Sequence, residues 1–225
     1  NRSYKSLKNI EEEFSCFCTD DISLLPKNAD LYIISVKDDA VREVAGILSA
    51  AISNVDACVV HTSGTLPLKI LTSYFKNAGV LYPLQTFTKN KQIDFSSVPF
   101  FIEGTAIVLN LLQKLLNDLS HNVYFIDSNE RKLLHLASVF ACNFVNHDIG
   151  IAKKILCKMS VIFPLISETI EKLKQLPPNE AQTGPAVRED FKVIDEHIKL
   201  LSDFPYEKAI YINTTNNIIR YKHLK

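Results

Sequence analysis

The chain has 225 residues, of which 47% are apolar and 22% charged, and its 25 basic residues balance its 25 acidic residues. This composition predicts an ordinary folded protein with one large or two small domains. Zero net charge argues against nucleic acid or a membrane surface as the main partner, and no apolar run approaches the length of a membrane span.

The five cysteines include no C-x-x-C pair, so neither a disulfide framework nor a zinc site is predicted. Cys16 and Cys18 have the wrong spacing for tetrahedral zinc ligands. We therefore expect free thiols in the reducing cytoplasm, and no bound metal.

Strands and helices alternate in the first half of the chain. A short polar helix is expected at 6–14, and 31–36 is a continuous apolar run, typical of a strand buried on both faces. Further strands are predicted at 57–61, 80–82, 98–103 and 123–127. Helices are predicted between them: one capped by Asp38 or Asp39 and running to about Ile52, one from Pro67 to about Gly79, and one over 105–119 with Val108, Leu111, Leu112, Leu115 and Leu119 inward. The alternation indicates an α/β fold with a mainly parallel sheet.

One long helix is expected after the last strand, from Asp127 to about Met159. Asp127 followed by Glu130 is the capping pattern of a helix start, and about 30 residues would span roughly 45 Å. One side forms an apolar stripe that we expect to be buried: Leu133, Leu136, Ala137, Phe140, Phe144 and Ile151. The other side carries polar and small residues: His135, Cys142, Asn143, Asn146 and Gly150. We infer that this helix bridges two domains and turns its polar side toward the cleft between them.

No strand is expected beyond Asp127. Helices are predicted from Pro164, around Phe191 to Leu201, and from about Tyr206. We therefore place the domain boundary at the start of the long helix, giving a sheet domain over 1–127 and a helical domain over 128–225.

Ligands of an open parallel sheet bind beyond the carboxyl ends of its strands. The loops at those ends collect hydroxyl, amide and imidazole groups, which favours a site there over ordinary polar turns. The candidate cofactor ligands are Ser35, Val36 and Lys37. The candidate substrate ligands are Thr62, Ser63, Gly64, Gln85 and, on the long helix, Asn146.

A histidine can protonate a forming alkoxide near neutral pH. His135 and His61 compete for this role. Asn143, with Asn146, could hydrogen-bond a substrate carbonyl or carboxylate, or could instead bond loop backbone.

None of the six glycines forms the G-x-G-x-x-G turn that holds a pyrophosphate. Arg2 and Ser3 nevertheless look like the end of a second Rossmann strand, where such residues hold the 2′-phosphate of NADP. We expect the first strand, the glycine turn and its helix to lie upstream of this chain, in about 20–30 residues.

Four ordered motifs now suggest a family. They are His61-Thr62-Ser63-Gly64, Tyr82-Pro83-Leu84-Gln85-Thr86-Phe87, the nine residues from His135 to Asn143, and the nine residues from Gln182 to Asp190. Together they resemble the Rossmann-like dehydrogenases that carry a C-terminal helical domain of unknown function. That family is similar in layout to the β-hydroxyacid dehydrogenases, ketopantoate reductase and pyrroline-5-carboxylate reductase. The resemblance implies an NADP-binding first domain and a homodimer.

Two features depart from these relatives. The glycine-rich turn is absent, and the catalytic Lys that some of them place one turn before the Asn of the long helix is replaced by Val139 here. Lys153 and Lys154 lie too far along the helix. Thr183-Gly184-Pro185 resembles a helix start, where the Gly184 amide, together with Arg188, could bind a substrate carboxylate. In a dimer, this loop could complete the site of the other subunit.

The sequence thus favours an NADP-dependent oxidoreductase that reduces a small oxo or imino acid, such as ketopantoate. The alternatives are a non-catalytic module of the same fold that binds a nucleotide or metabolite, and a structural dimer built on the C-terminal helices.

Overall fold

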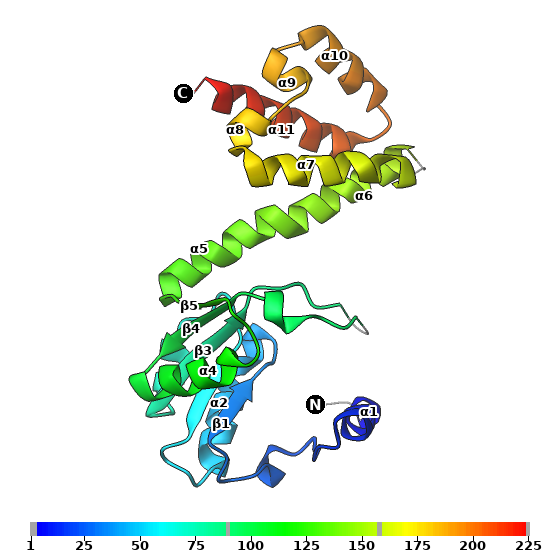
Figure 1. Cartoon of the computed structure of the whole chain (residues 1–225). Helices are drawn as coiled ribbons and strands as arrows, with labels where there is room; N and C mark the ends of the chain where they lie inside the picture. Colours follow the sequence, from blue (N-terminus) through cyan, green and yellow to red (C-terminus); the bar gives the residue numbers. More distant parts are fainter. Residues whose placement is uncertain (1–3, 89–90, 157–158, 224–225) are drawn as a thin grey trace. The chain divides into compact units, whose positions relative to one another are not determined.

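The protein, described by a computed structural model, contains one five-stranded sheet followed by helices (Figure 1). Residues 4–88, 91–156 and 159–223 are described. The chain divides into two units, Asn1–Ala141 and Cys142–Lys225. The predicted division between residues 127 and 128 stays a prediction.

The sheet has the strand order β1-β2-β3-β4-β5. β1, β2 and β3 are parallel, β4 is antiparallel to β3, and β5 is parallel to β4. This confirms the predicted mainly parallel α/β architecture. The strands are β1 (Leu31–Ile34), β2 (Cys58–His61), β3 (Asn77–Pro83), β4 (Phe100–Gly104) and β5 (Val123–Phe125).

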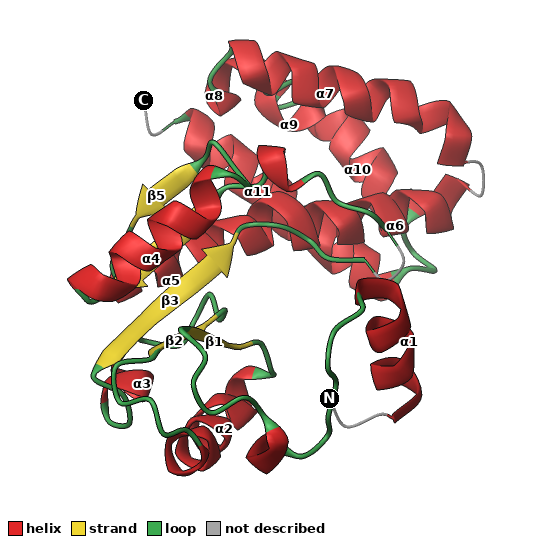
Figure 2. Ribbon diagram, turned by 60° about the horizontal axis from the view of Figure 1, so that its bottom comes forward, coloured by secondary structure: helices red, strands yellow, loops and turns green. Residues whose placement is uncertain are grey.

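Helices cover both faces of this sheet. The helices of the first unit are α1 (Tyr4–Phe14), α2 (Asp38–Ala51), α3 (Lys69–Thr72), α4 (Ala106–Asn117) and α5 (Ser128–Ser138), of which α2, α3 and α4 pack on the sheet. Short 3-10 turns lie at Ile22–Leu24 and Phe95–Ser97. Figure 2 shows α2 and α3 on one side of the sheet and α4 on the other.

Because neighbouring residues of a strand point to opposite faces, the sheet supports two apolar cores. On one face, Val59 and Ala78 pack with α2 and α3. On the other, Val60 and Ile102 pack with α4.

Two predicted helices differ in detail. The helix expected from Pro67 to Gly79 is a single turn, α3, because residues 77–80 pair with β2 and so belong to β3. In α4, the buried side chains are Val108, Leu112 and Leu116, and the predicted inward residues Leu115 and Leu119 are exposed. Burial at a spacing of four residues gives a narrower stripe than predicted.

The predicted cap of α2 is also wrong. Lys37 is the N-cap residue, without a side-chain cap, and Asp38 and Asp39 lie in the first turn. The Asp38 carboxylate is engaged elsewhere, as acceptor from Ser63 and Thr65 in the loop after β2.

The long helix begins as predicted. Asp127 and Glu130 form a complete capping box at the start of α5. The helix is not uniform, however, because a π-helical segment, Val139–Phe144, joins α5 to α6 (Val145–Leu156). A π segment inserts an extra residue, so it shifts the face that later side chains occupy relative to an unbroken α-helical pattern.

The prediction that the apolar stripe is buried is wrong for a single copy of the chain. Leu133, Leu136, Phe140 and Phe144 are exposed, and the buried residue of α5 is Arg131. Polar contacts instead hold α5 to the sheet, where Arg131 and Ser128 both bind Glu103 of β4.

The second unit is entirely helical among its described residues, as predicted. It contains α6, α7 (Phe163–Gln175), α8 (Pro178–Ala181), α9 (Pro185–Arg188), α10 (Phe191–Leu200) and α11 (Pro205–Lys222), with a 3-10 turn at Met159–Ile162. Across the described chain, every helix is too short or too polar to cross a bilayer.

Candidate functional site

The candidate site lies in the first unit, at the edge of the sheet where β1, β2 and β3 end. Ser35, Val36 and Lys37 follow β1 and are exposed. Thr62 follows β2, and its hydroxyl lies 3.4 Å from the hydroxyl of Ser35. The structure therefore brings the first two predicted loops together.

The turn after β2 is held by Ser63. The Ser63 hydroxyl donates to Asp38 Oδ2 at 2.9 Å and accepts from the backbone N–H groups of Thr65 at 3.1 Å and Leu66 at 3.0 Å. Ser63 is buried. This hydroxyl is therefore occupied in shaping the turn, and a substrate would have to displace one of these bonds.

His61 lies under the same turn, out of reach of solvent. Its side chain is fully buried, and Nδ1 accepts a hydrogen bond from the Ser63 N–H at 3.2 Å. Burial, helped by the nearby positive charge of Arg131, lowers the pKa of His61 to about 4. The imidazole is therefore neutral at pH 7, which is unfavourable for a proton donor.

His135 lies on α5 and faces the turn. Its Nδ1 is 3.2 Å from the Tyr82 hydroxyl oxygen, and the two rings meet edge to face with centroids 6.3 Å apart. A Cβ atom added at Gly64 would lie 2.7 Å from His135 Nδ1 and 3.0 Å from Tyr82 Cζ, closer than atoms pack. The absence of a side chain at Gly64 thus allows the imidazole to lie against the turn.

A buried arginine fixes α5 in this position. The Arg131 guanidinium is fully buried, forms an ion pair with Glu103 of β4 and donates to the Leu66 carbonyl in the turn. Ser128 donates to Glu103 Oε1 at 2.8 Å and accepts from the Leu68 N–H at 3.0 Å. Helix, sheet and turn are therefore joined beside His135 by directed polar contacts.

Sequence reasoning missed Arg131 and Glu103, and gave Tyr82 no role. A signal for Tyr82 existed in its place at the end of a strand, next to a proline. For Arg131 the only hint was its position one residue after the capping box, which is not specific for burial.

In the third loop, Gln85 is exposed, and it stays a prediction as a substrate ligand. The side chain of Gln85 turns back on its own loop, where Oε1 accepts from the Thr86 N–H at 2.8 Å. Arg2 and Ser3 lie outside the described residues.

The remaining candidates belong to the second unit. Asn143 and Asn146 are exposed on the π segment and on α6. Gly184, with φ 108°, is the N-cap of α9, which is a single turn that begins at Pro185 and ends at Arg188. Proline has no N–H, so this helix start offers fewer amides for a carboxylate than predicted. All four stay predictions as substrate ligands.

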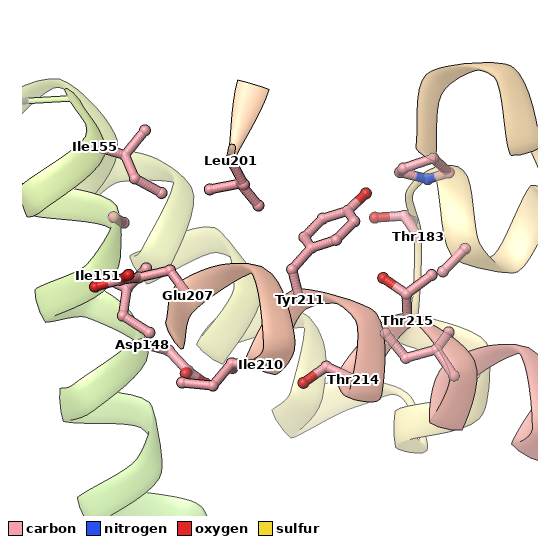
Figure 3. Close-up of a pocket in the computed structure, with 14 residues that line it drawn as sticks. Asp148, Ile151, Ile155, Thr183, Leu201, Glu207, Ile210, Tyr211, Thr214 and Thr215 are labelled. Carbon is pink, nitrogen blue, oxygen red and sulfur yellow. The ribbon is translucent and has the colours of Figure 1, made fainter. Parts of the chain in front are cut away.

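The second unit also contains a pocket of about 360 Å³ between α6, α9 and α11 (Figure 3). Its walls are mainly apolar, with Ile151, Ile155 and Ile210 among them. Glu207 lies at one wall, where its carboxylate binds Lys154 of α6 at 2.6 Å. All the residues that line this pocket belong to the second unit, and none of the predicted proton donors is among them.

The geometry around His135 suits proton transfer next to a bound small molecule. The imidazole is half-buried, and Tyr82 engages one of its two nitrogens. The hydroxyl groups of Ser35, which is exposed, and of Thr62, which is half-buried, are suited to hydrogen-bond an uncharged sugar or amide. Asp38 and Asp39 in the first turn of α2 disfavour a phosphate at that helix start.

Comparison with solved structures finds the same architecture elsewhere. A Bacteroides fragilis protein, BF3122, provisionally named an NADP oxidoreductase, is 36% identical, with a TM-score of 0.91 over 98% of this chain and 86% of its own. Protein TM1727 of Thermotoga maritima is 22% identical, with a TM-score of 0.74 over 99% of this chain and 89% of its own.

A more distant structure shares the fold alone. An imine reductase of Myxococcus stipitatus, solved with NADP+, is 11% identical, with a TM-score of 0.59 over 98% of this chain and 82% of its own. No curated protein matches the chain.

The family model described as a domain of unknown function, DUF2520, matches residues 98–218. This range contains β4, β5 and α5, and hence both Glu103 and His135, and runs into α11. The chain therefore belongs to the DUF2520 family of Rossmann-like proteins.

Proposed function

We propose that this protein is an NADP-dependent oxidoreductase that reduces a small oxo or imino acid, with His135 as the proton donor. The observation that carries the proposal is the position of His135 against Gly64, beside the loops that follow the parallel strands. The 36% identity to the provisionally named NADP oxidoreductase of Bacteroides fragilis supports the cofactor.

NADPH would supply a hydride. The residues of this chain would do the rest. Ser35 would hydrogen-bond the uncharged part of the cofactor near the nicotinamide, with Val36 and Lys37 beside it, and Thr62, whose hydroxyl lies 3.4 Å from that of Ser35, would hydrogen-bond the substrate. His135 would give a proton to the substrate oxygen or nitrogen. His61, which sequence reasoning left as an equal candidate, is the weaker choice because it is buried and neutral.

The substrate acid group would need a cation or amides. Arg131 is unsuited, since Glu103 and the Leu66 carbonyl already occupy its guanidinium. Arg188, which is exposed on α9, with the Gly184 amide, stays the proposed partner of the carboxylate, and Asn143 and Asn146 stay proposed partners of the carbonyl or imine.

We also propose a homodimer formed through the C-terminal helices. α6 and α7 leave large apolar side chains exposed, among them Ile155, Leu165 and Ile170. An extended apolar surface on a single chain is typical of a protein interface. The described cysteines are free thiols, which supports the proposed cytoplasmic location.

The alternative is a binding module of the same fold that does not catalyse a reaction. It is favoured by Val139, which occupies the position where some of the dehydrogenases that this chain resembles in layout carry a catalytic lysine.

The test is a titration of the protein with NADPH, followed by NADPH oxidation with 2-oxo acids, including ketopantoate, and with cyclic imino acids. The proposal predicts binding and oxidation with at least one acid. Binding without oxidation by any compound of either class would favour the binding module, and no binding of NADPH would refute the oxidoreductase.

A further inference from the structure

Tyr82 is the side chain that His135 meets most directly. The hydroxyl oxygen lies 3.2 Å from His135 Nδ1, a distance at the limit of a normal hydrogen bond in proteins. Tyr82 comes from β3 and His135 from α5, so the contact joins the sheet to the helix. Gly64 packs against both rings, which restricts their movement relative to each other.

Either group can be the donor in this contact, because a phenol both donates and accepts and the roles of the imidazole nitrogens depend on its tautomer. Burial raises the pKa of Tyr82, so the phenol keeps its proton at neutral pH and can act as donor. A neutral imidazole has one N–H and one acceptor nitrogen. If the phenol donates to Nδ1, the imidazole proton stays on Nε2.

The same hydroxyl also suits the charged imidazole. In that state both ring nitrogens carry protons, and Nδ1–H can donate to the phenol oxygen. A tyrosine can therefore stay hydrogen-bonded to Nδ1 whether the imidazole is neutral or charged. A phenylalanine has the same shape but no hydroxyl, so it cannot form this bond.

We propose that Tyr82 is the positioning residue of this site: its hydroxyl holds His135 through Nδ1, so that Nε2 of the protonated ring faces the substrate and gives it a proton, which leaves a neutral imidazole. The role of Nε2 rests on the proposed function. Tyr82 itself need not touch the substrate, in the same way that second groups orient catalytic histidines in other sites.

The test uses Y82F, which removes only the hydroxyl. Nitrogen-15 NMR of the whole protein distinguishes a protonated from an unprotonated ring nitrogen, and H135N identifies the signals of His135. In the neutral state we expect Nδ1 to be the unprotonated nitrogen in the wild type, and both tautomers to be populated in Y82F. Y124F is the matched control, because Tyr124 is an exposed aromatic of β5 that stacks on Phe101.

Turnover gives the second readout. Loss of one neutral hydrogen bond predicts a decrease of about 3- to 10-fold in kcat for Y82F with little change in KM, and none for Y124F. A wild-type His135 protonated at Nδ1, or a Y82F variant with unchanged tautomer and unchanged kcat, would overturn the proposal. The tautomer measurement needs no substrate, so it decides the role of Tyr82 separately from the NADPH assay.

Discussion

Replacing Arg131 by Met should lower the free energy of unfolding of the first unit more than replacing an exposed charged residue does. Met fills a similar length of apolar space but leaves the Glu103 carboxylate without its cation and the Leu66 carbonyl without its donor. Because the Arg131 side chain is 0% exposed and that of Glu103 16%, water cannot easily replace the lost contacts.

Removing one partner of a buried ion pair typically costs about 3–5 kcal/mol. A domain is commonly stable by only about 5–15 kcal/mol, so R131M should be folded with a small margin. Ser128 limits the loss, because its hydroxyl still donates to Glu103.

The assay is urea unfolding followed by circular dichroism, with K76M as the matched control. Lys76 also pairs with an acidic residue, Asp56, but both side chains are largely exposed, at 73% and 69%, so its loss should change little. The double variant R131M/E103Q should recover part of the stability lost in R131M, because it removes the unpaired charge. If R131M is no less stable than K76M, the network does not hold α5 to the sheet.

Three further changes test the surroundings of His135 and His61. G64A should destabilise the protein by about 1–3 kcal/mol, since the new Cβ would lie 2.7 Å from His135 Nδ1, whereas G46A in α2, with 3.6 Å to the nearest ring atom, should be neutral or stabilising. Equal unfolding midpoints for the two would contradict this packing. The pKa of His61 is about 4 in the folded protein, below its unfolded value of 6.5. The stability that the neutral His61 side chain contributes is therefore complete above pH 6.5, and it is lost as pH falls toward 4. Over this window the wild type should lose about 3 kcal/mol more than H61Q in urea unfolding, and parallel pH profiles would disprove the buried neutral state.

Much of the fold was predictable because its signals are local. Continuous apolar strands, a capping box at Asp127 and the alternation of strand and helix each follow from short-range patterns. Strand and helix ends were less predictable: Asn77 joins β3 because pairing with β2 outweighs helix propensity.

The location of the candidate site could be predicted from the sequence, but only some of its side-chain contacts could. Parallel strands bring their carboxyl ends to one edge, so the meeting of Ser35 and Thr62 follows from topology. His135 beside Tyr82 depends on the angle at which α5 leaves the sheet. That angle is set by Arg131 and Glu103, a long-range pair with no periodic signal.

The apolar stripe illustrates the opposite error. Leu133 and Leu136 have helical spacing. Such spacing predicts that one face of the helix is buried, but it does not identify the surface that packs against this face. In the single chain these residues are exposed, and the helix is attached through its polar first turns instead. In the proposed homodimer, a second copy of the chain would cover these apolar side chains.

The most direct test of the proposed function compares NADPH oxidation by H135N and H121N, using the acid that gives the highest wild-type rate. His121 is an exposed histidine of the loop before β5, so H121N controls for the loss of an imidazole. The proposal predicts equal NADPH affinity in both variants, unchanged turnover in H121N, and turnover lowered about 10²- to 10⁴-fold in H135N. Wild-type turnover in a folded H135N would show that His135 is not the proton donor.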